Sequence, residues 1–231
     1  MPFSLLSKPA VLENLGKGVI IHPYNPKHLK SGSYDVRIGM YYYKRRATSE
    51  THEPMFNPFD PGAVVRHFGP FHTAEPARCI AGFAANPTLW TGIDPDDKVI
   101  LLEPGEMILG HTEEYIGGTK DPASGRCFLA EMKARSSIGR LGLEVCRCAG
   151  WGDVGYVNRW TMEIVNTSNS AVPIIVGMRV AQMKFYEVDP IADEDMYGVD
   201  ANRDHYQVSV DLAQLQRDWK PEMMLPRISK T

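Results

Sequence analysis

The sequence predicts a mainly β fold, either a sandwich or a barrel, and three observations lead to this prediction. Short segments rich in β-branched and aromatic residues recur along the chain at spacings of about 8 to 12 residues. Glycine, proline, asparagine and serine separate these segments, as they do at turns. The 231 residues, 43% of them hydrophobic, suffice for one domain whose core needs no disulfides.

The N-terminal elements precede a long irregular stretch. Residues 8–16 predict a short helix that ends at a glycine, and residues 18–26 predict a strand that prolines stop. Residues 32–46 alternate and are rich in β-branched and aromatic residues, so they predict a strand. Residues 47–97 contain seven prolines and little periodicity. We expect a long, partly ordered insertion there.

The β pattern returns at residue 98. Residues 98–116 predict a strand, a Pro-Gly turn and a second strand, and residues 125–142 predict a strand that runs into a short helix near Ser136. Three more segments read as strands: residues 143–151, 159–168 and 171–188. Residues 209–219 predict a short C-terminal helix. We expect a single domain over residues 1–231, with the Pro-rich insertion at about 47–97 and a C-terminal tail from about 190.

Charge and hydropathy exclude several classes of function. The net charge is −3 and no block of five or six like charges occurs, so non-specific binding to nucleic acid or to a membrane surface is not indicated. The N-terminus has no charged region before an apolar segment, and no apolar run approaches the ~18 residues of a membrane span. We expect a soluble, cytoplasmic protein.

The four cysteines do not form a C-x-x-C motif. Cys146 and Cys148 are two residues apart in a strand pattern, which predicts that they share one face. The favoured interpretation of all four is small core residues in a reducing cytosol.

Familiar catalytic motifs are absent or incomplete. His111, Thr112 and Glu113 have the H-x-E spacing of zinc nucleoside deaminases, but the P-C-x-x-C that completes their metal site is missing. We therefore interpret these residues as a surface strand end, and a zinc-dependent mechanism is disfavoured. The sequence also lacks G-x-S-x-G, a P-loop and G-x-G-x-x-G.

Residues 132–166 carry unusually many polar groups within strand-like segments. Arg135, Ser136, Ser137 and Arg140 surround a strand-to-helix junction, where backbone N–H groups, hydroxyls and guanidinium groups can bind phosphate. The alternative is a serine N-cap with two arginines in solvent.

Two further acidic residues follow this junction. Asp153 and Tyr156 stand in the glycine-broken segment "AGWGDVGY", where an aspartate alone is typical of a turn. Glu163 interrupts the strand pattern of "RWTMEIVN", so its side chain either faces solvent or belongs to a site.

In this order, the segments resemble the trimeric dUTPase superfamily and, within it, the dCTP deaminase branch. The R-S-S-x-x-R-x-G and D-x-G-aromatic-x(6)-E patterns are specific when they occur together. The matching segments are "SYDVRIG", "EPGEMILGHTEEYI", "KARSSIGRLGLEV", "CAGWGDVGYVNRWTMEIVN", "PIIVGMRVAQMKF" and, weakly, "YGVDANRDHYQ". The resemblance implies a distorted β-barrel or jelly roll with a few short helices, assembled as a homotrimer with active sites between subunits.

The resemblance also implies a reaction: zinc-independent hydrolysis of dCTP to dUTP and ammonia. Glu163 would activate the water that attacks C4 of cytosine, Ser136 would help to hold that water, and Arg140 would be the catalytic arginine. Asp153 matches the loop that contacts the deoxyribose. Under the alternative of a dUTP pyrophosphatase, it would be the general base for the water that attacks the α-phosphate.

The remaining implied residues bind the substrate, a deoxyribonucleoside triphosphate accompanied by Mg²⁺ that its phosphates mainly hold. Arg135 and Ser137 would hold the triphosphate and Tyr156 the sugar. A base-contacting segment (Ala149, Gly150, Trp151) and a C-terminal tail that closes over the triphosphate (Tyr197, His205, Gln207) would complete the site.

The base-contacting segment departs from the commonest pattern of the branch. Gly150 and Trp151 stand where many monofunctional deaminases have a His-Arg pair. This looks more like the bifunctional members, which continue from dUTP to dUMP and pyrophosphate. Two alternatives stay open: a dUTP pyrophosphatase, and a non-catalytic nucleotide-binding module on the same fold.

Overall fold

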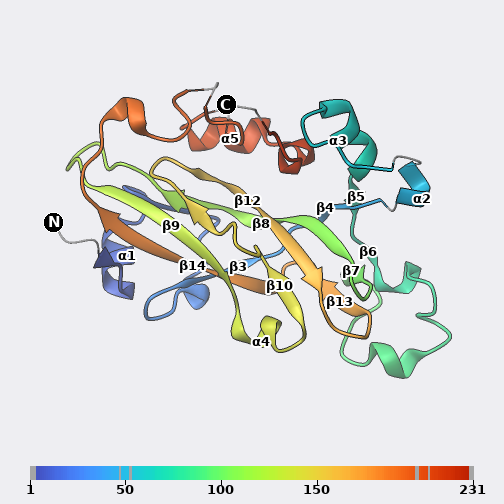
Figure 1. The fold of residues 1–231 in the computed structure, drawn as a ribbon. Coiled ribbons are helices and arrows are strands. Elements are labelled where there is room, and N and C mark those ends of the chain that lie inside the picture. Colours follow the sequence, from blue (N-terminus) through green and yellow to red (C-terminus); the bar gives the residue numbers. More distant parts are fainter. Residues whose placement is uncertain (1–3, 47, 52–53, 201–202, 208, 229–231) are drawn as a thin grey trace.

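The computed structural model describes residues 4–46, 48–51, 54–200, 203–207 and 209–228 (Figure 1). Strands dominate it, so the mainly β prediction is confirmed. No helix of the described residues is both long and apolar enough to cross a membrane.

Within these described ranges, the strands form two large sheets and one small sheet, and all pairs are antiparallel. The first sheet has the order β1 (Ser4–Leu5), β14 (Arg179–Val188), β9 (Cys127–Ala134) and β11 (Trp151–Gly152), with β3 (Tyr34–Arg37) also paired to β14. The second has the order β10 (Leu143–Val145), β12 (Val157–Asn166), β8 (Met107–Gly118), β4 (Tyr41–Lys44) and β5 (His72–Thr73), with β2 (Val19–His22) also paired to β8. The small sheet has the order β13 (Val172–Ile175), β7 (Lys98–Leu102) and β6 (Glu75–Pro76).

The main core lies between the two large sheets. Phe128 and Phe185 come from the first sheet, whereas Ile116, Trp160 and Met162 come from the second, and all five are buried in one cluster. Sheet-on-sheet packing of this kind is the sandwich arrangement that the alternating segments predicted.

Side chains along β12 alternate between the core and the outer face of the second sheet. Trp160, Met162 and Ile164 point into the core. Thr161 and Glu163 lie between them in sequence, so they point to the opposite face of the sheet. A polar residue in this strand pattern therefore marks the outer face of the second sheet.

Residues from the Pro-rich insertion pack on this outer face. The segment contains α2 (Thr48–Thr51) and α3 (Pro61–Phe68), and its β5 and β6 join two of the sheets. Asp60 caps α3 by accepting a hydrogen bond from the Gly62 N–H. Val64 and Phe68 of α3 form a second hydrophobic cluster with Tyr43, Leu109 and Met224.

The C-terminal tail runs back across the same face. It contains α5 (Leu212–Asp218) and a 3₁₀ turn at Pro221–Met224, which lie above β12 and β8 in Figure 1. The helix predicted over residues 209–219 is therefore present. The other helices are α1 (Lys8–Asn14), which matches the prediction for residues 8–16, and α4 (Ser136–Gly139), which begins at the predicted Ser136. Further 3₁₀ turns lie at Pro26–His28, Ala77–Cys79, Pro87–Trp90 and Asp193–Asp195.

One predicted strand is wrong in extent. Residues 32–46 form two strands, β3 and β4, in different sheets rather than one continuous strand. The chain crosses between the sheets at Gly39, whose N–H donates to the carbonyl of His111. A Cβ at this position would overlap the His111 ring, so only glycine permits the crossing.

The prediction for the cysteines is also wrong in part. β10 ends at Val145, and Cys146 and Arg147 adopt the left-handed region with φ of 64° and 38°. Cys146 is buried whereas Cys148 is exposed, so the two do not share a face. Cys79 is exposed as well, and Cys127 is the second buried cysteine.

Candidate functional site

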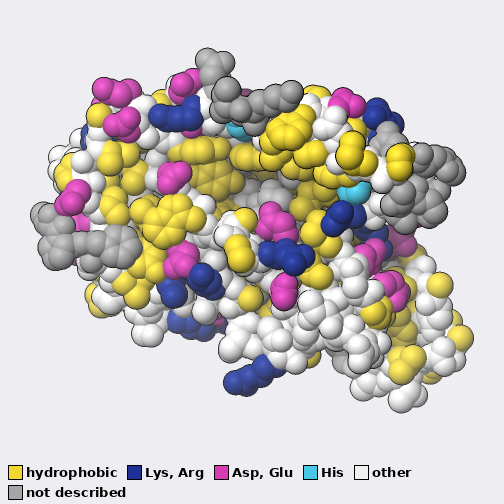
Figure 2. Space-filling view, in the orientation of Figure 1, with side chains coloured by type: hydrophobic (Ala, Val, Ile, Leu, Met, Phe, Trp, Pro, Cys, Tyr) yellow, Lys and Arg dark blue, Asp and Glu magenta, His cyan; other side chains and the backbone are white. Residues whose placement is uncertain are grey.

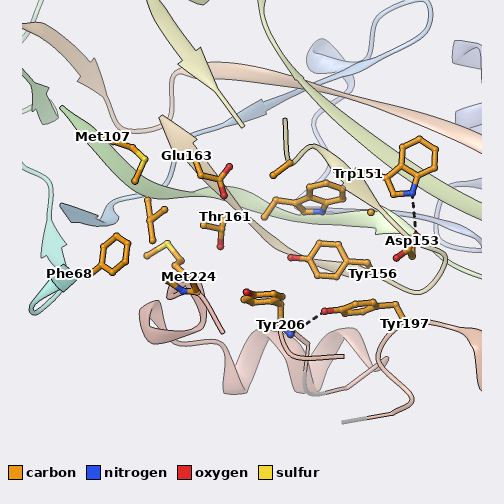
Figure 3. Close-up of a pocket in the computed structure, with 15 residues that line it drawn as sticks. Phe68, Met107, Trp151, Asp153, Tyr156, Thr161, Glu163, Tyr197, Tyr206 and Met224 are labelled. Atoms are coloured by element: carbon orange, nitrogen blue, oxygen red, sulfur yellow. Dashed lines mark hydrogen bonds between the residues drawn. The ribbon is translucent and has the colours of Figure 1, made fainter. Parts of the chain in front are cut away.

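A pocket of ≈490 Å³ lies on the outer face of the second sheet, within the size range of small-molecule sites (Figure 3). β12, the loop over residues 149–156, α3 and the C-terminal tail enclose it. Its lining consists of Phe68, Met107, Leu109, Ala149, Trp151, Gly152, Asp153, Tyr156, Trp160, Thr161, Glu163, Tyr197, Tyr206, Met224 and Pro226. Six residues that the sequence predicted as substrate-binding or catalytic thus meet in one place: Ala149, Trp151, Asp153, Tyr156, Glu163 and Tyr197.

Glu163 is the polar centre of the pocket. Its Oε2 is buried and has no hydrogen-bond partner among the described residues. Burial raises the pKa of this carboxyl, and the charge of Arg147 opposes the shift. A carboxyl whose pKa moves toward neutrality can accept a proton and return it in one reaction. The interpretation of Glu163 as a solvent-facing strand residue is therefore wrong.

The glycine-broken loop places Asp153 and Tyr156 in the same pocket as this carboxylate. Gly155 has φ of 101°, and a Cβ there would collide with the Tyr197 carbonyl, so the turn requires glycine. The Tyr156 ring contacts the Trp160 and Tyr197 rings edge-on, with centroids 5.1 Å apart in both pairs. Burial raises the pKa of Tyr156, so its hydroxyl stays protonated.

Trp151 and Asp153 lie at the outer end of the pocket. The Trp151 Nε1–H donates to Asp153 Oδ1 over 3.2 Å, and both residues are exposed. Gly150 lies just outside the lining. A Cβ there would overlap the Met132 carbonyl, because the Met132 N–H donates to the Gly150 carbonyl over 2.6 Å.

Of the tail residues that the sequence predicted, only Tyr197 lines the pocket. Gln207 is buried, its Nε2 donates to the Gly155 carbonyl over 2.8 Å, and its Oε1 accepts from the Val157 N–H over 2.9 Å. Its amide thus clamps the tail onto the loop that carries Asp153. His205 lies outside the pocket and lines a neighbouring groove between α3 and the tail.

The strand-to-helix junction lies elsewhere in the chain. Ser136, Ser137 and Arg140 are exposed on and beside α4, at the opposite edge of the molecule from α5 (Figure 1). Arg135 Nε lies 3.4 Å from the buried carboxylate of Asp35, and its Nη1 donates to the Arg179 carbonyl. A single chain therefore does not bring these four residues to Glu163.

Several pocket residues were not predicted. Thr161 shares the outer face of β12 with Glu163, so strand alternation could have identified it. Phe68, Met107 and Met224 come from three segments far apart in sequence (Figure 3). No local sequence pattern predicts that these three residues line the same pocket.

His111 is buried at 1% exposure rather than at a surface strand end, so that interpretation is wrong. Its ring packs on Gly39, its Nδ1 lies 2.8 Å from the Thr112 carbonyl, and its Nε2 accepts from the Tyr41 N–H. Burial lowers the pKa of His111 to about 4, so the ring is neutral at pH 7. Within the described part of the chain, no group of three or more His, Cys, Asp or Glu residues could hold a metal ion.

An aromatic cage next to His111 holds the tail in place. The Arg159 guanidinium lies between the rings of Tyr115 and Trp219, 5.1 Å and 4.8 Å from their centroids. The Trp219 ring also contacts the His111 ring, with centroids 4.7 Å apart. Trp219 follows α5 directly, so this cation–π cage fixes the end of α5 to the sheet.

The chain matches one described family along most of its length. The family described as dCTP deaminase-like matches residues 5–188. A protein named "dCTP deaminase, dUMP-forming" from Bifidobacterium longum (strain DJO10A) is 30% identical over 205 residues, covering 88% of this chain and 89% of the relative. One of the same name from Clostridium beijerinckii is 28% identical over 193 residues, covering 84% and 87%.

Solved structures resemble the chain more distantly. A crystal structure of 2'-deoxycytidine 5'-triphosphate deaminase from Agrobacterium tumefaciens aligns with a TM-score of 0.49 and 15% identity over 80% of this chain. This chain spans 49% of that structure's chain. The native EIAV dUTPase aligns with a TM-score of 0.32 and 17% identity, over 42% of this chain and 79% of that one.

Proposed function

This chain belongs to the dCTP deaminase-like family, and from that premise we propose that it hydrolyses dCTP to dUTP and ammonia and carries the dUTP on to dUMP and pyrophosphate. The observation that carries the proposal is the buried Oε2 of Glu163, which has no hydrogen-bond partner among the described residues and lies in a pocket that also contains Asp153 and Tyr156. The names of the relatives, which are dUMP-forming deaminases, support the second step.

Glu163 has the properties that the first step needs. A water that adds to C4 of cytosine must lose a proton, and the departing nitrogen must gain one. Because burial raises the pKa of Glu163, its carboxylate is a stronger base than an exposed glutamate and its acid form is more readily populated near neutral pH. We assign both proton transfers to this residue, without zinc.

The second step needs a base near the α-phosphate. Asp153 lies at the outer end of the pocket, beside Tyr156, which we assign to the deoxyribose. The hydrogen bond from the Trp151 Nε1–H holds the Asp153 carboxylate in place. We propose that Asp153 activates the water that cleaves the triphosphate of dUTP, while Ala149, Gly150 and Trp151 border the base.

Charge supports a site that two copies of the chain share. None of the residues that line the pocket in the described ranges is a lysine or an arginine, and two are acidic. A triphosphate needs cationic partners. We propose a homotrimer in which α4 of a neighbouring copy supplies Arg135, Ser136, Ser137 and Arg140, with Ser136 and Arg140 at the reacting centre.

We propose that Mg²⁺ enters with the substrate, held mainly by its phosphate oxygens. A phosphate-bound Mg²⁺ usually keeps several waters and takes few protein ligands, so we assign it no side chain of this pocket. When bound, the ion would neutralise charge on the triphosphate. We assign the closing contacts of the tail to Tyr197 and His205, whereas Gln207 holds the tail on the loop that carries Asp153.

The test is a product assay on the purified protein. It is incubated with dCTP or with dUTP, in the presence of Mg²⁺ or of a chelator, and nucleotides and ammonia are measured. We expect ammonia and dUMP from dCTP, and dUMP from dUTP. Turnover of dUTP alone would instead indicate a dUTP pyrophosphatase. Binding of both nucleotides without turnover would indicate a non-catalytic module.

A further inference from the structure

We propose that the pocket is built for a cytosine with an apolar substituent on C5, and that 5-methyl-dCTP is a better substrate than dCTP. This inference rests on the proposed function and specifies its substrate class.

The pocket has two chemically different halves on either side of Glu163 (Figure 3). One half contains Asp153 and three aromatic residues with polar groups: Trp151, Tyr156 and Tyr197. The other half contains Phe68, Met107, Leu109 and Met224, and none of these side chains carries a hydrogen-bonding group of the kind that a base amide or a phosphate requires. The part of a ligand that enters the second half is therefore apolar. Thr161 shares the outer face of β12 with Glu163 and lies beside it at the boundary of the two halves.

Three separate segments build the apolar half. Leu109 of β8 pairs with Glu163 of β12, and Met107 pairs with Val165. Leu109 and Met107 therefore lie beside the carboxylate of Glu163. Phe68 comes from α3 of the Pro-rich insertion, and Met224 from the C-terminal 3₁₀ turn. Phe68, Leu109 and Met224 belong to the second hydrophobic cluster, so their packing holds this wall in place. Figure 2 shows hydrophobic side chains gathered on this face beneath the C-terminal elements.

The orientation of the nucleotide directs C5 toward this wall. With the sugar at Tyr156 and C4 at Glu163, the long axis of the pyrimidine from N1 to C4 runs from the aromatic half to the apolar half. C5 is one of the two ring atoms bonded to C4, so a group on C5 lies to the side of C4. We place this edge of the ring toward Leu109 and Met107, which lie beside Glu163, so that a group on C5 contacts the apolar wall. Unmodified cytosine has only hydrogen there and leaves apolar wall uncovered. A methyl group would cover it, and methionine side chains adapt readily to such a group.

The chemistry at C4 is unchanged by the methyl group. The water oxygen forms the C4–O bond, one of its protons passes through Glu163 to the exocyclic nitrogen and the other ends on N3, and the C4–N bond breaks to release ammonia. The product is 5-methyl-dUTP, which is thymidine triphosphate. No oxidant, reductant or further reactant is needed.

The experiment compares kcat/KM for 5-methyl-dCTP and dCTP with the wild-type chain and with Met107→Trp, which fills the apolar half. We expect the wild-type chain to prefer 5-methyl-dCTP about 10-fold, as one carbon in an apolar pocket typically changes specificity. Met107→Trp should abolish or reverse this preference. Met55→Trp, at an exposed methionine of the insertion outside the pocket, should keep it.

The wild-type ratio decides the proposal even where a variant does not fold. Turnover of dCTP with an equal or lower kcat/KM for 5-methyl-dCTP overturns the inference and leaves the proposed deamination intact. A preference that survives Met107→Trp shows that the selectivity arises elsewhere, and it also overturns the inference. Ammonia from neither nucleotide refutes the proposed function, and the inference falls with it.

Discussion

The pocket around Glu163 and the junction at α4 differ in what each can do alone, although one stretch of 35 residues, 132–166, encodes both. The pocket has carboxylates, aromatic rings and a defined volume but no cationic side chain in its described lining. The α4 junction has two exposed serines and an exposed arginine but lies at another edge of the chain. The pocket lacks the cationic side chain that the α4 junction has, and the junction lacks the enclosed carboxylates of the pocket.

This difference shows how neighbours in sequence can serve different sites. β10 and a loop with two left-handed residues separate α4 from β12, so the chain turns away from the junction before it reaches the pocket. Motifs that follow one another in sequence can thus be two halves of a site, which a second copy of the chain unites. In a symmetric oligomer every copy gives one half and receives the other.

The largest expected effect comes from removing the negative charge of Glu163 from the pocket. Glu163→Gln should lower ammonia release from dCTP about 10³-fold, which is typical for loss of a general acid–base group. Binding of the nucleotide should persist, because the amide keeps the shape of the side chain. Ammonia release measures the first effect and equilibrium titration the second. Wild-type turnover by this variant would refute the role of Glu163.

The same substitution should stabilise the folded chain at neutral pH. Because burial raises the pKa of Glu163, the folded state binds its proton more tightly than the unfolded state. This contribution is fully present below the ordinary glutamate pKa and is lost as the pH rises through the raised value. Above it the unpartnered charge costs stability, and Gln should recover about 1 kcal/mol. Urea unfolding at pH 5 and pH 8 measures this, with exposed Glu13→Gln as control.

The second prediction tests whether the two halves come from different copies. Arg140→Ala should lower turnover about 10²-fold, because it removes a charge from the proposed reacting centre. Co-expression of Arg140→Ala and Glu163→Gln chains should restore activity. With random assembly of equal amounts, about one quarter of the sites combine two intact halves.

Two observations sharpen this test. Arg78→Ala, at an exposed arginine of the insertion, should retain full activity. This control would show that the activity loss in Arg140→Ala is specific to that arginine. Mixed oligomers that are no more active than the sum of the two inactive variants would show that each site belongs to one copy.

The smallest expected effect concerns the C-terminal tail that covers the pocket. Trp219→Ala removes the contacts with Arg159 and His111 that hold the end of α5 on the sheet. We expect KM for dCTP to rise about 5-fold, equivalent to ~1 kcal/mol, while kcat changes little. Hydrogen exchange of residues 212–224 should increase. The control is Trp90→Ala in the insertion, and an unchanged KM in Trp219→Ala would contradict a positioning role for the tail.

Local patterns predicted most of the strands and the helix at Ser136, and they singled out Asp153, Tyr156 and Glu163, which the structure brings into one pocket. The roles of these three residues stay a prediction. The patterns succeeded because period-2 alternation and glycine-broken turns are properties of neighbouring residues. Phe68 and Met224 were missed because they reach the pocket through long-range packing of the insertion and the tail. His111 was misjudged because its burial depends on Gly39, more than 70 residues earlier in the chain. The assignment of α4 to a neighbouring copy stays a prediction.

The amide of Gln207 has a consequence for how the protein tolerates changes in length. It pairs with the backbone of Gly155 and Val157 in the interior, so Gln207 is a structural part of the loop that carries Asp153 rather than an appendage. A truncation before Gln207 would leave a donor and an acceptor of that loop exposed to whatever water enters. Deletions or insertions that remove or shift this anchor are therefore expected to disturb the loop.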